Sequence, residues 1–177
     1  MRAARLLWHT RVADKKTVNI REAIAVCLLL ALCGCNRGRP AYTPALGEIM
    51  TLTQMRHAKL WLAGKSKNWP LAAYEVDELE EGFADAAAYH PTHKTSPVRL
   101  ERIIPLMTGE PLKSLRKAIA DQDPQEFQPA FDSLTKACNG CHQATNFGFN
   151  VVIRPSANTF SNQDFRAAQR QRSGTTP

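Results

Sequence analysis

Residues 123–142 read DPQEFQPAFDSLTKACNGCH, and this stretch decides the predicted fold. Asp123 followed by Pro124 and Glu126 is typical of a helix start, with an aspartate cap, a proline at the first position and a capping box. Pro129 follows so soon that it predicts a kink, or a start about one turn later. One apolar stripe then recurs at helical spacing: Phe127, Phe131, Leu134, Cys138, Cys141 and His142.

Three earlier segments carry the same helical period. The first helix is expected over residues 45–63, the second begins near Trp69 with Pro70 in its first turn, and the third follows a loop over residues 90–97. Residues 108–111 (TGEP) are expected to interrupt the third helix. Four amphipathic helices joined by short or moderate loops predict an all-α fold, an antiparallel four-helix bundle with a short irregular C-terminal tail.

The period also predicts which side chains form the core. Met55 falls on the outer face of the first helix, and the acidic run of the second helix indicates a solvated face rather than a docking patch for a basic partner. The acidic residues are Glu75, Asp77, Glu78, Glu80, Glu81 and Asp85. The expected core positions of these two helices are Leu46, Ile49, Met50, Thr53, His57, Leu60, Trp61, Ala72, Val76, Leu79, Phe83 and Ala86 or Ala87.

The N-terminal segment has the marks of an export signal. Residues 1–22 are polar and basic, residues 23–32 form the short apolar run AIAVCLLLAL, and Cys33, Gly34 and Cys35 follow. The run is too short to span a bilayer. Its end resembles a bacterial lipobox, so Cys35 is the predicted lipidation site and would hold the protein to a membrane surface. An ordinary cleaved signal and a buried helix of a cytosolic protein are the alternatives.

The charge of the chain argues against a nucleic-acid partner. The 177 residues include 23 Lys and Arg against 16 Asp and Glu, a formal net charge of +7. Much of this excess lies in residues 1–35, of which the mature lipoprotein is expected to keep only Cys35. No Ser-His-Asp set, Gly-rich phosphate loop or paired acid–base carboxylates can be identified, so an enzyme is not expected.

Residues 138–142, CNGCH, match C-x-x-C-H, the attachment sequence of c-type haem. Positions i, i+3 and i+4 share one helix face, so Cys138 and Cys141 can both add to vinyl groups on one porphyrin edge while His142 supplies the proximal iron ligand. Export agrees with this interpretation. A redox-active cysteine pair would favour a βαβ setting, a zinc site would need further ligands, and a plain disulfide leaves His142 unexplained.

The motif near the end of the last of four helices resembles the cytochrome c prime class and its low-spin relatives. The resemblance covers about residues 45–145 in helix order and motif position, with CNGCH as the specific match. The chain departs from the family in the longer segment that follows His142. The resemblance implies a periplasmic or lipid-anchored haem protein that carries electrons or binds small gases such as NO or CO. The expected partners are redox proteins of the periplasm or membrane and, in a homodimer, a second copy of the chain.

The ligand opposite His142 is open between three alternatives. In an up-down-up-down bundle the last helix ends where the first begins, so the haem would lie near Met50, which faces inward. Low-spin relatives use a first-helix methionine that Met50 resembles. His57 lies about 10 Å further along the axis, and His90 and His93 are expected in a solvent-facing loop. The alternatives are Met50, no protein ligand, and a histidine.

These predictions divide the chain into four parts. Residues 1–35 are the predicted signal peptide of lipoprotein type, 36–44 a linker, 45–160 the four-helix-bundle haem c domain and 161–177 a flexible polar tail. The expected function is electron transfer by an exported monohaem c-type cytochrome, with a five-coordinate gas-binding haem protein as the alternative. The expected location is the periplasmic side of a bacterial membrane, lipid-anchored or soluble.

Overall fold

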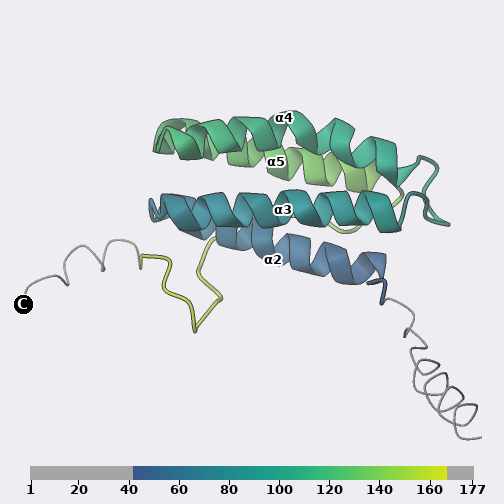
Figure 1. The fold of residues 1–177 in the computed structure, drawn as a ribbon, viewed down its shortest axis with the longest axis horizontal. Coiled ribbons are helices and arrows are strands. Elements are labelled where there is room, and N and C mark those ends of the chain that lie inside the picture. Colours follow the sequence, from purple (N-terminus) through teal and green to yellow (C-terminus); the bar gives the residue numbers. More distant parts are fainter. Residues whose placement is uncertain (1–41, 167–177) are drawn as a thin grey trace, which may run out of the picture. The chain divides into compact units, whose positions relative to one another are not determined.

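The computed structural model describes residues 42–166, which form four helices and no strand (Figure 1). The helices are α2 (Leu46–Lys65), α3 (Trp69–Tyr89), α4 (Leu100–Ala120) and α5 (Pro124–Ala144). Each packs on the next along the chain, and α2 also contacts α5. The predicted all-α four-helix bundle is confirmed. The signal peptide with Cys35, most of the linker and the end of the tail lie outside the described residues.

Short connections make consecutive helices run in opposite directions (Figure 1). The links over residues 66–68 and 121–123 each pass through one residue with a left-handed backbone, Lys67 at φ 57° and Gln122 at φ 55°. In the first link, the backbone N–H of Asn68 donates to the carbonyl of Ala63 at 2.9 Å. This bond satisfies a carbonyl that the helix end leaves free and turns the chain into the next helix.

The predicted interruption of the third helix is wrong, because α4 continues through residues 108–111. Pro105 and Pro111 each remove one backbone donor from this helix. Tertiary packing outweighs that loss, since most of the stability of a helix in a protein comes from its buried face. The buried stripe runs unbroken past both prolines: Leu100, Ile104, Thr108, Leu112, Leu115, Ala118 and Ile119.

The predicted Asp123 cap and the proline at the start of α5 are confirmed, whereas the predicted capping box with Glu126 is not formed. The Asp123 carboxylate accepts hydrogen bonds from the backbone N–H groups of Gln125 at 2.8 Å and Glu126 at 3.2 Å. The Asp123 N–H donates to the carbonyl of Ala118 at 2.9 Å, in place of the return bond of a capping box. The helix begins at Pro124 and continues through Pro129, so the later start does not occur.

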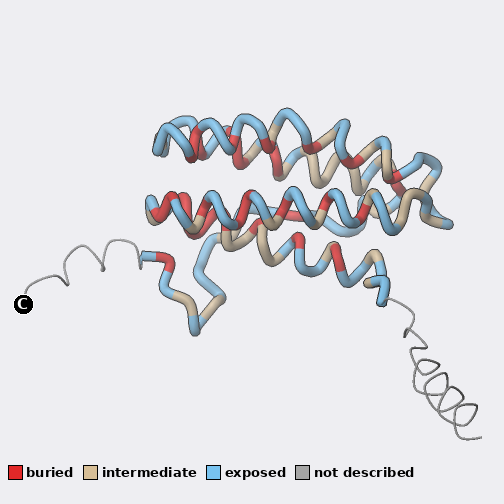
Figure 2. Tube along the Cα trace, in the orientation of Figure 1, coloured by how far each residue is buried: buried red, intermediate tan, exposed pale blue. Residues whose placement is uncertain are grey.

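Buried residues recur along all four helices (Figure 2). Aromatic rings fill the end of the bundle at which α2 ends and α3 begins. The ring centroids of Trp61 and Phe131 lie 5.1 Å apart, and those of Trp69 and Phe127 lie 5.9 Å apart. The predicted core positions of α2 and α3 are buried, apart from Leu46, Met50 and Ala87, which are half-buried against the core.

Glu75 departs from the solvated face expected for the acidic run of α3. Its side chain is 1% exposed and pairs with Arg56, whose Nη1 lies 3.3 Å from Glu75 Oε2. Burial raises the pKa of Glu75, and Arg56 opposes that shift. Arg56 also reaches Glu78 at 2.7 Å, so one guanidinium on α2 joins two carboxylates of α3.

The segment after α5 packs back onto the bundle. Phe165 is buried, and its carbonyl accepts a hydrogen bond from Asn68 Nδ2 at 2.9 Å. Phe160 also packs against the core. Packing therefore extends beyond residue 160, where the flexible tail was expected to begin, because two aromatic side chains interrupt an otherwise polar stretch.

Candidate functional site

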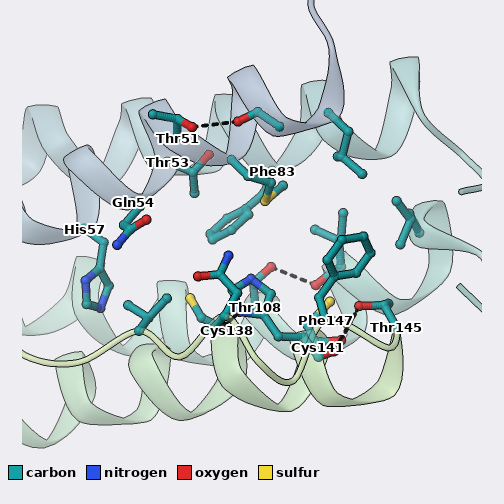
Figure 3. Close-up of a pocket in the computed structure, with 18 of the residues that line it drawn as sticks. Thr51, Thr53, Gln54, His57, Phe83, Thr108, Cys138, Cys141, Thr145 and Phe147 are labelled. Carbon is teal, nitrogen blue, oxygen red and sulfur yellow. Dashed lines mark hydrogen bonds between the residues drawn. The ribbon is translucent and has the colours of Figure 1, made fainter. Parts of the chain in front are cut away.

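A cavity of about 370 Å³ lies between the first half of α2, the second half of α3, the first half of α4 and the last turns of α5. Cys138 and Cys141 face across it toward Thr53 and Phe83 (Figure 3). We call it the cysteine cavity. It is lined by Leu46, Gly47, Met50, Thr51, Thr53, Gln54, His57, Phe83, His93, Leu100, Ile104, Thr108, Cys138, Cys141, His142, Thr145, Phe147, Asn150 and Val152.

The two thiols are half-buried and are not joined in a disulfide. Burial, with a smaller contribution from Cys141, raises the pKa of Cys138 to about 12. Burial also raises the pKa of Cys141. Redox-active C-x-x-C pairs show the opposite shift, because their environments favour the thiolate. The surroundings of these thiols therefore differ from those of a dithiol redox centre.

His142 presents one defined ring nitrogen for binding. Its Nδ1 lies 2.6 Å from the backbone carbonyl oxygen of Asn150. A carbonyl can only accept, so Nδ1 carries the proton and donates it to this bond. In a neutral imidazole with this tautomer, the lone pair lies on Nε2. Metal-binding histidines are commonly held in this way, with the second nitrogen bonded to a backbone carbonyl.

The turn after α5 brings Asn150 to His142. Asn146 adopts a left-handed backbone with φ 66°, and the Phe147 N–H donates to the His142 carbonyl at 2.7 Å. The Asn150 N–H then donates to the Phe147 carbonyl at 2.8 Å. Two successive turns thus reverse the chain within eight residues. Sequence reasoning missed Asn150, because a backbone carbonyl leaves no residue-type signal.

The two methionines of α2 differ in their relation to the cavity, although both are half-buried and Met55 is not on the exposed outer face that its helical position predicts. Met50 is half-buried, packs against the core and lines the cysteine cavity that also contains His142. Met55 does not line this cavity. The structure therefore brings Met50 and His142 to one space, and ligation by Met50 stays a prediction.

The other three histidines of the described residues 42–166 occupy different settings. His57 is 2% exposed at the cavity wall, where its Nε2 lies 2.8 Å from Thr135 Oγ1 and burial lowers its pKa to about 4. His90 bonds through Nε2 to the Pro44 carbonyl at 2.8 Å and does not line the cavity. His93 was expected to meet solvent, but it is half-buried and lines the cavity, with its ring centroid 5.3 Å from that of Phe147.

The donor set does not resemble a zinc centre. Within residues 42–166, no group of three or more His, Cys, Asp or Glu side chains is placed to hold a metal ion. Structural zinc sites need four such ligands and catalytic ones need three.

In this same part of the chain, no helix has the length and hydropathy needed to cross a membrane.

No protein-family model, curated protein or solved structure matches this chain. The resemblance to cytochrome c prime therefore rests on CNGCH and the helix order alone. What the site can do has to be argued from its own geometry.

Proposed function

We propose that the chain is an exported c-type cytochrome that carries electrons, with one haem bound covalently to Cys138 and Cys141 and its iron bound by His142. One observation carries the proposal: these three side chains line a single cavity, and Nδ1 of His142 bonds to the Asn150 carbonyl, so Nε2 is the ring nitrogen left to bind iron. Their spacing on α5 matches the two thioether bonds and one axial bond of a c-type haem.

The walls of the cysteine cavity suit a porphyrin. Apolar side chains from every helix and from the segment after α5 line it, among them Leu46, Phe83, Ile104 and Val152. Burial of a flat apolar ring against such side chains is favourable by about 25 cal/mol for each Å² removed from water. These side chains would exclude water from the iron and hold the ring in place.

A bound haem would supply an iron that changes between the ferric and ferrous states. The chain would accept one electron from a reduced redox protein and pass one to an oxidised redox protein. During this exchange His142 and Met50 would hold the iron, which keeps its ligands in both oxidation states. A thioether ligand raises the reduction potential relative to an open site.

Haem attachment is the first test. The chain is produced with a bacterial haem-attachment system, and haem is sought on a denaturing gel and as a mass increase of one haem. The wild type and the exposed-site control Ser133→Ala should keep haem. The double variant Cys138→Ala, Cys141→Ala should lose it. A haem-free wild type beside a working control cytochrome would overturn the proposal.

The sixth ligand is tested by spectra of the reduced protein. Met50→Ala should convert low-spin ferrous haem to high-spin and speed carbon monoxide binding, because the position opposite His142 opens. Met55→Ala, on the same helix but outside the cavity, should leave the spectrum unchanged. A high-spin wild type would favour the gas-binding alternative. A change confined to the His93→Ala variant would assign the ligand to the loop between α3 and α4.

We also propose that the protein is anchored by lipid at Cys35 on the periplasmic side of a bacterial membrane. The predicted signal and lipobox support this location. Cell fractionation of the wild type and Cys35→Ser is the test, with processing checked by mass. The wild type should sediment with membranes and the variant should not. Equal solubility of both after correct processing would favour a soluble periplasmic protein.

A further inference from the structure

We infer that residues 150–154 form a strap that orients the His142 imidazole, and that Asn139, inside the CNGCH motif, is the positioning residue that holds this strap. The inference rests on the proposed haem function, because its effect is exerted on an iron ligand. It gives a role to the long segment after α5.

Asn139 bonds the strap through both ends of its amide. Its Nδ2 donates to the Val152 carbonyl at 2.8 Å, and its Oδ1 accepts from the Val152 N–H at 2.8 Å. The two bonds pair with the N–H and the carbonyl of Val152, as the backbone of a neighbouring strand would. Alanine could form neither bond.

We call these two Asn139–Val152 hydrogen bonds the clamp. The hydrogen bond between His142 and Asn150 lies next to it. Asn150 precedes Val152 by two residues, and Asn139 precedes His142 by three on α5. The clamp and the bond from His142 Nδ1 to the Asn150 carbonyl are therefore about one helical turn apart. Fixing Val152 against α5 thus fixes the carbonyl on which the imidazole orientation depends.

A third anchor continues the strap along α5. Arg154 donates to Asp132 Oδ1 from Nη2 at 2.6 Å and from Nε at 3.1 Å, and its guanidinium lies 4.6 Å from the centroid of the Trp61 ring. Along the strap, Asn150, Val152 and Arg154 bond in turn to His142, Asn139 and Asp132. Because this order is the reverse of their order along α5, the strap runs antiparallel to the helix. A surface ion pair alone contributes little, but the stacking and the two-pronged geometry restrict where Arg154 can lie.

Asn139 does not line the cysteine cavity, whereas Val152 and Asn150 do. Asn139 therefore does not act on the iron by direct contact, and its two bonds to Val152 point to an effect through the strap. The bond from Nδ1–H to a carbonyl increases the electron donation of Nε2, which favours the ferric state. Loosening the strap should weaken this bond and shift the equilibrium toward the ferrous state.

The test is the reduction potential of the haem-loaded protein. Asn139→Ala should shift the ferrous-to-ferric ratio at a fixed applied potential by roughly tenfold, about 59 mV upward for one electron. Arg154→Lys keeps the charge but loses the two-pronged bond, so it should shift the potential in the same direction by less. Ser133→Ala, on the exposed side of α5, should leave the potential unchanged.

The outcomes separate the two proposals. Haem on all variants with unchanged potentials would overturn the strap and leave the haem assignment standing. Loss of haem from Asn139→Ala alone would also overturn the inference, because the residue would then act in attachment. A wild type without haem would reject the proposed function itself. A rise in both variants that combines less than additively in the double variant supports one shared strap.

Discussion

At the scale of single residues, Gly64 is the position where α2 comes close to α5. A Cβ atom at Gly64 would lie 2.1 Å from Cζ of Phe127, a ring that is 2% exposed. Gly64→Ala should therefore force the ring or the helix to move and lower the free energy of unfolding by about 1–3 kcal/mol. Chemical denaturation followed by helical circular dichroism measures this.

Gly109→Ala is the matched control for that clash. Gly109 is an exposed interior residue of α4, and a Cβ there would have no atom within 4 Å. The substitution should raise the free energy of unfolding by about 0.5–1 kcal/mol, because alanine favours the helix. If the two alanine variants shift stability equally, the packing of Gly64 against Phe127 is not the cause.

His57 predicts a pH dependence of stability. Burial lowers the pKa of its imidazole from 6.5 to about 4. Between these two pH values, the unfolded chain therefore binds a proton at His57 that the folded protein does not bind. The free energy of unfolding should therefore fall as the pH drops from 6.5 to 4, by at most about 1.4 kcal/mol per pH unit from this group. Denaturation at a series of pH values measures the slope.

His57→Gln removes the titrating group while keeping a polar side chain. The slope between pH 4 and 6.5 should become shallower than in the wild type, although the variant is less stable at neutral pH. Glu75 acts in the opposite direction, since its raised pKa favours protonation in the folded state. Only the difference between variant and wild type is therefore diagnostic. Parallel pH profiles would show that His57 does not titrate as assigned.

At the scale of helices, apolar periodicity was enough to predict all four elements and most of the core. The cap of α5 was also predictable, because the bonds to Asp123 are local. The break in α4 was predicted from Gly109 and Pro111, and it was wrong. That prediction used only the local helix propensity of these residues. The continuity of α4 depends instead on its packing against α3 and α5, which a local pattern does not report.

Pro111→Ala should stabilise α4. The substitution restores a backbone N–H that can donate to the carbonyl four residues earlier and removes the clash of the ring with it. The helix gains up to about 3 kcal/mol, offset by about 0.4–1 kcal/mol because the unfolded chain becomes more flexible. A net gain of about 1–2 kcal/mol should raise the thermal midpoint.

Pro124→Ala provides the comparison at a helix start. At the first position of α5 the missing N–H has no partner within the helix, so its restoration gains nothing. This variant should be neutral or less stable by up to about 1 kcal/mol. A stabilised Pro124→Ala together with an unchanged Pro111→Ala would contradict the account of α4.

The same distinction applies to the candidate site. Some of its residues could be placed from their spacing along one helix, and others are brought there only by turns and loops. Spacing placed Cys138, Cys141 and His142 on one face, and periodicity placed Met50 toward them. The Asn150 carbonyl could not be predicted, since any residue can supply it and only the turn after α5 brings it near. His93 was expected to meet solvent for a related reason, because the loop between α3 and α4 carries no periodic pattern that could place it at the cavity.

At the scale of the whole bundle, the two ends differ in packing. The end that contains Trp61, Trp69 and Phe127 is filled by aromatic rings, and the end that contains Met50 and Cys141 encloses the cysteine cavity. Without haem, side chains around the cavity lack partners on one side, so they lose dispersion contacts that the filled end keeps. Local stability should therefore depend on haem at one end of the bundle only.

Amide hydrogen exchange tests this difference between haem-loaded wild type and the haem-free variant Cys138→Ala, Cys141→Ala. Amides near Met50 and in the last turns of α5 should exchange roughly tenfold faster or more without haem, equivalent to about 1.4 kcal/mol of local stability. Amides near Trp61 and Phe127 should change much less, because their contacts do not involve the cavity. A uniform loss of protection along all four helices would instead indicate that the bundle unfolds as one unit, with haem stabilising every part equally.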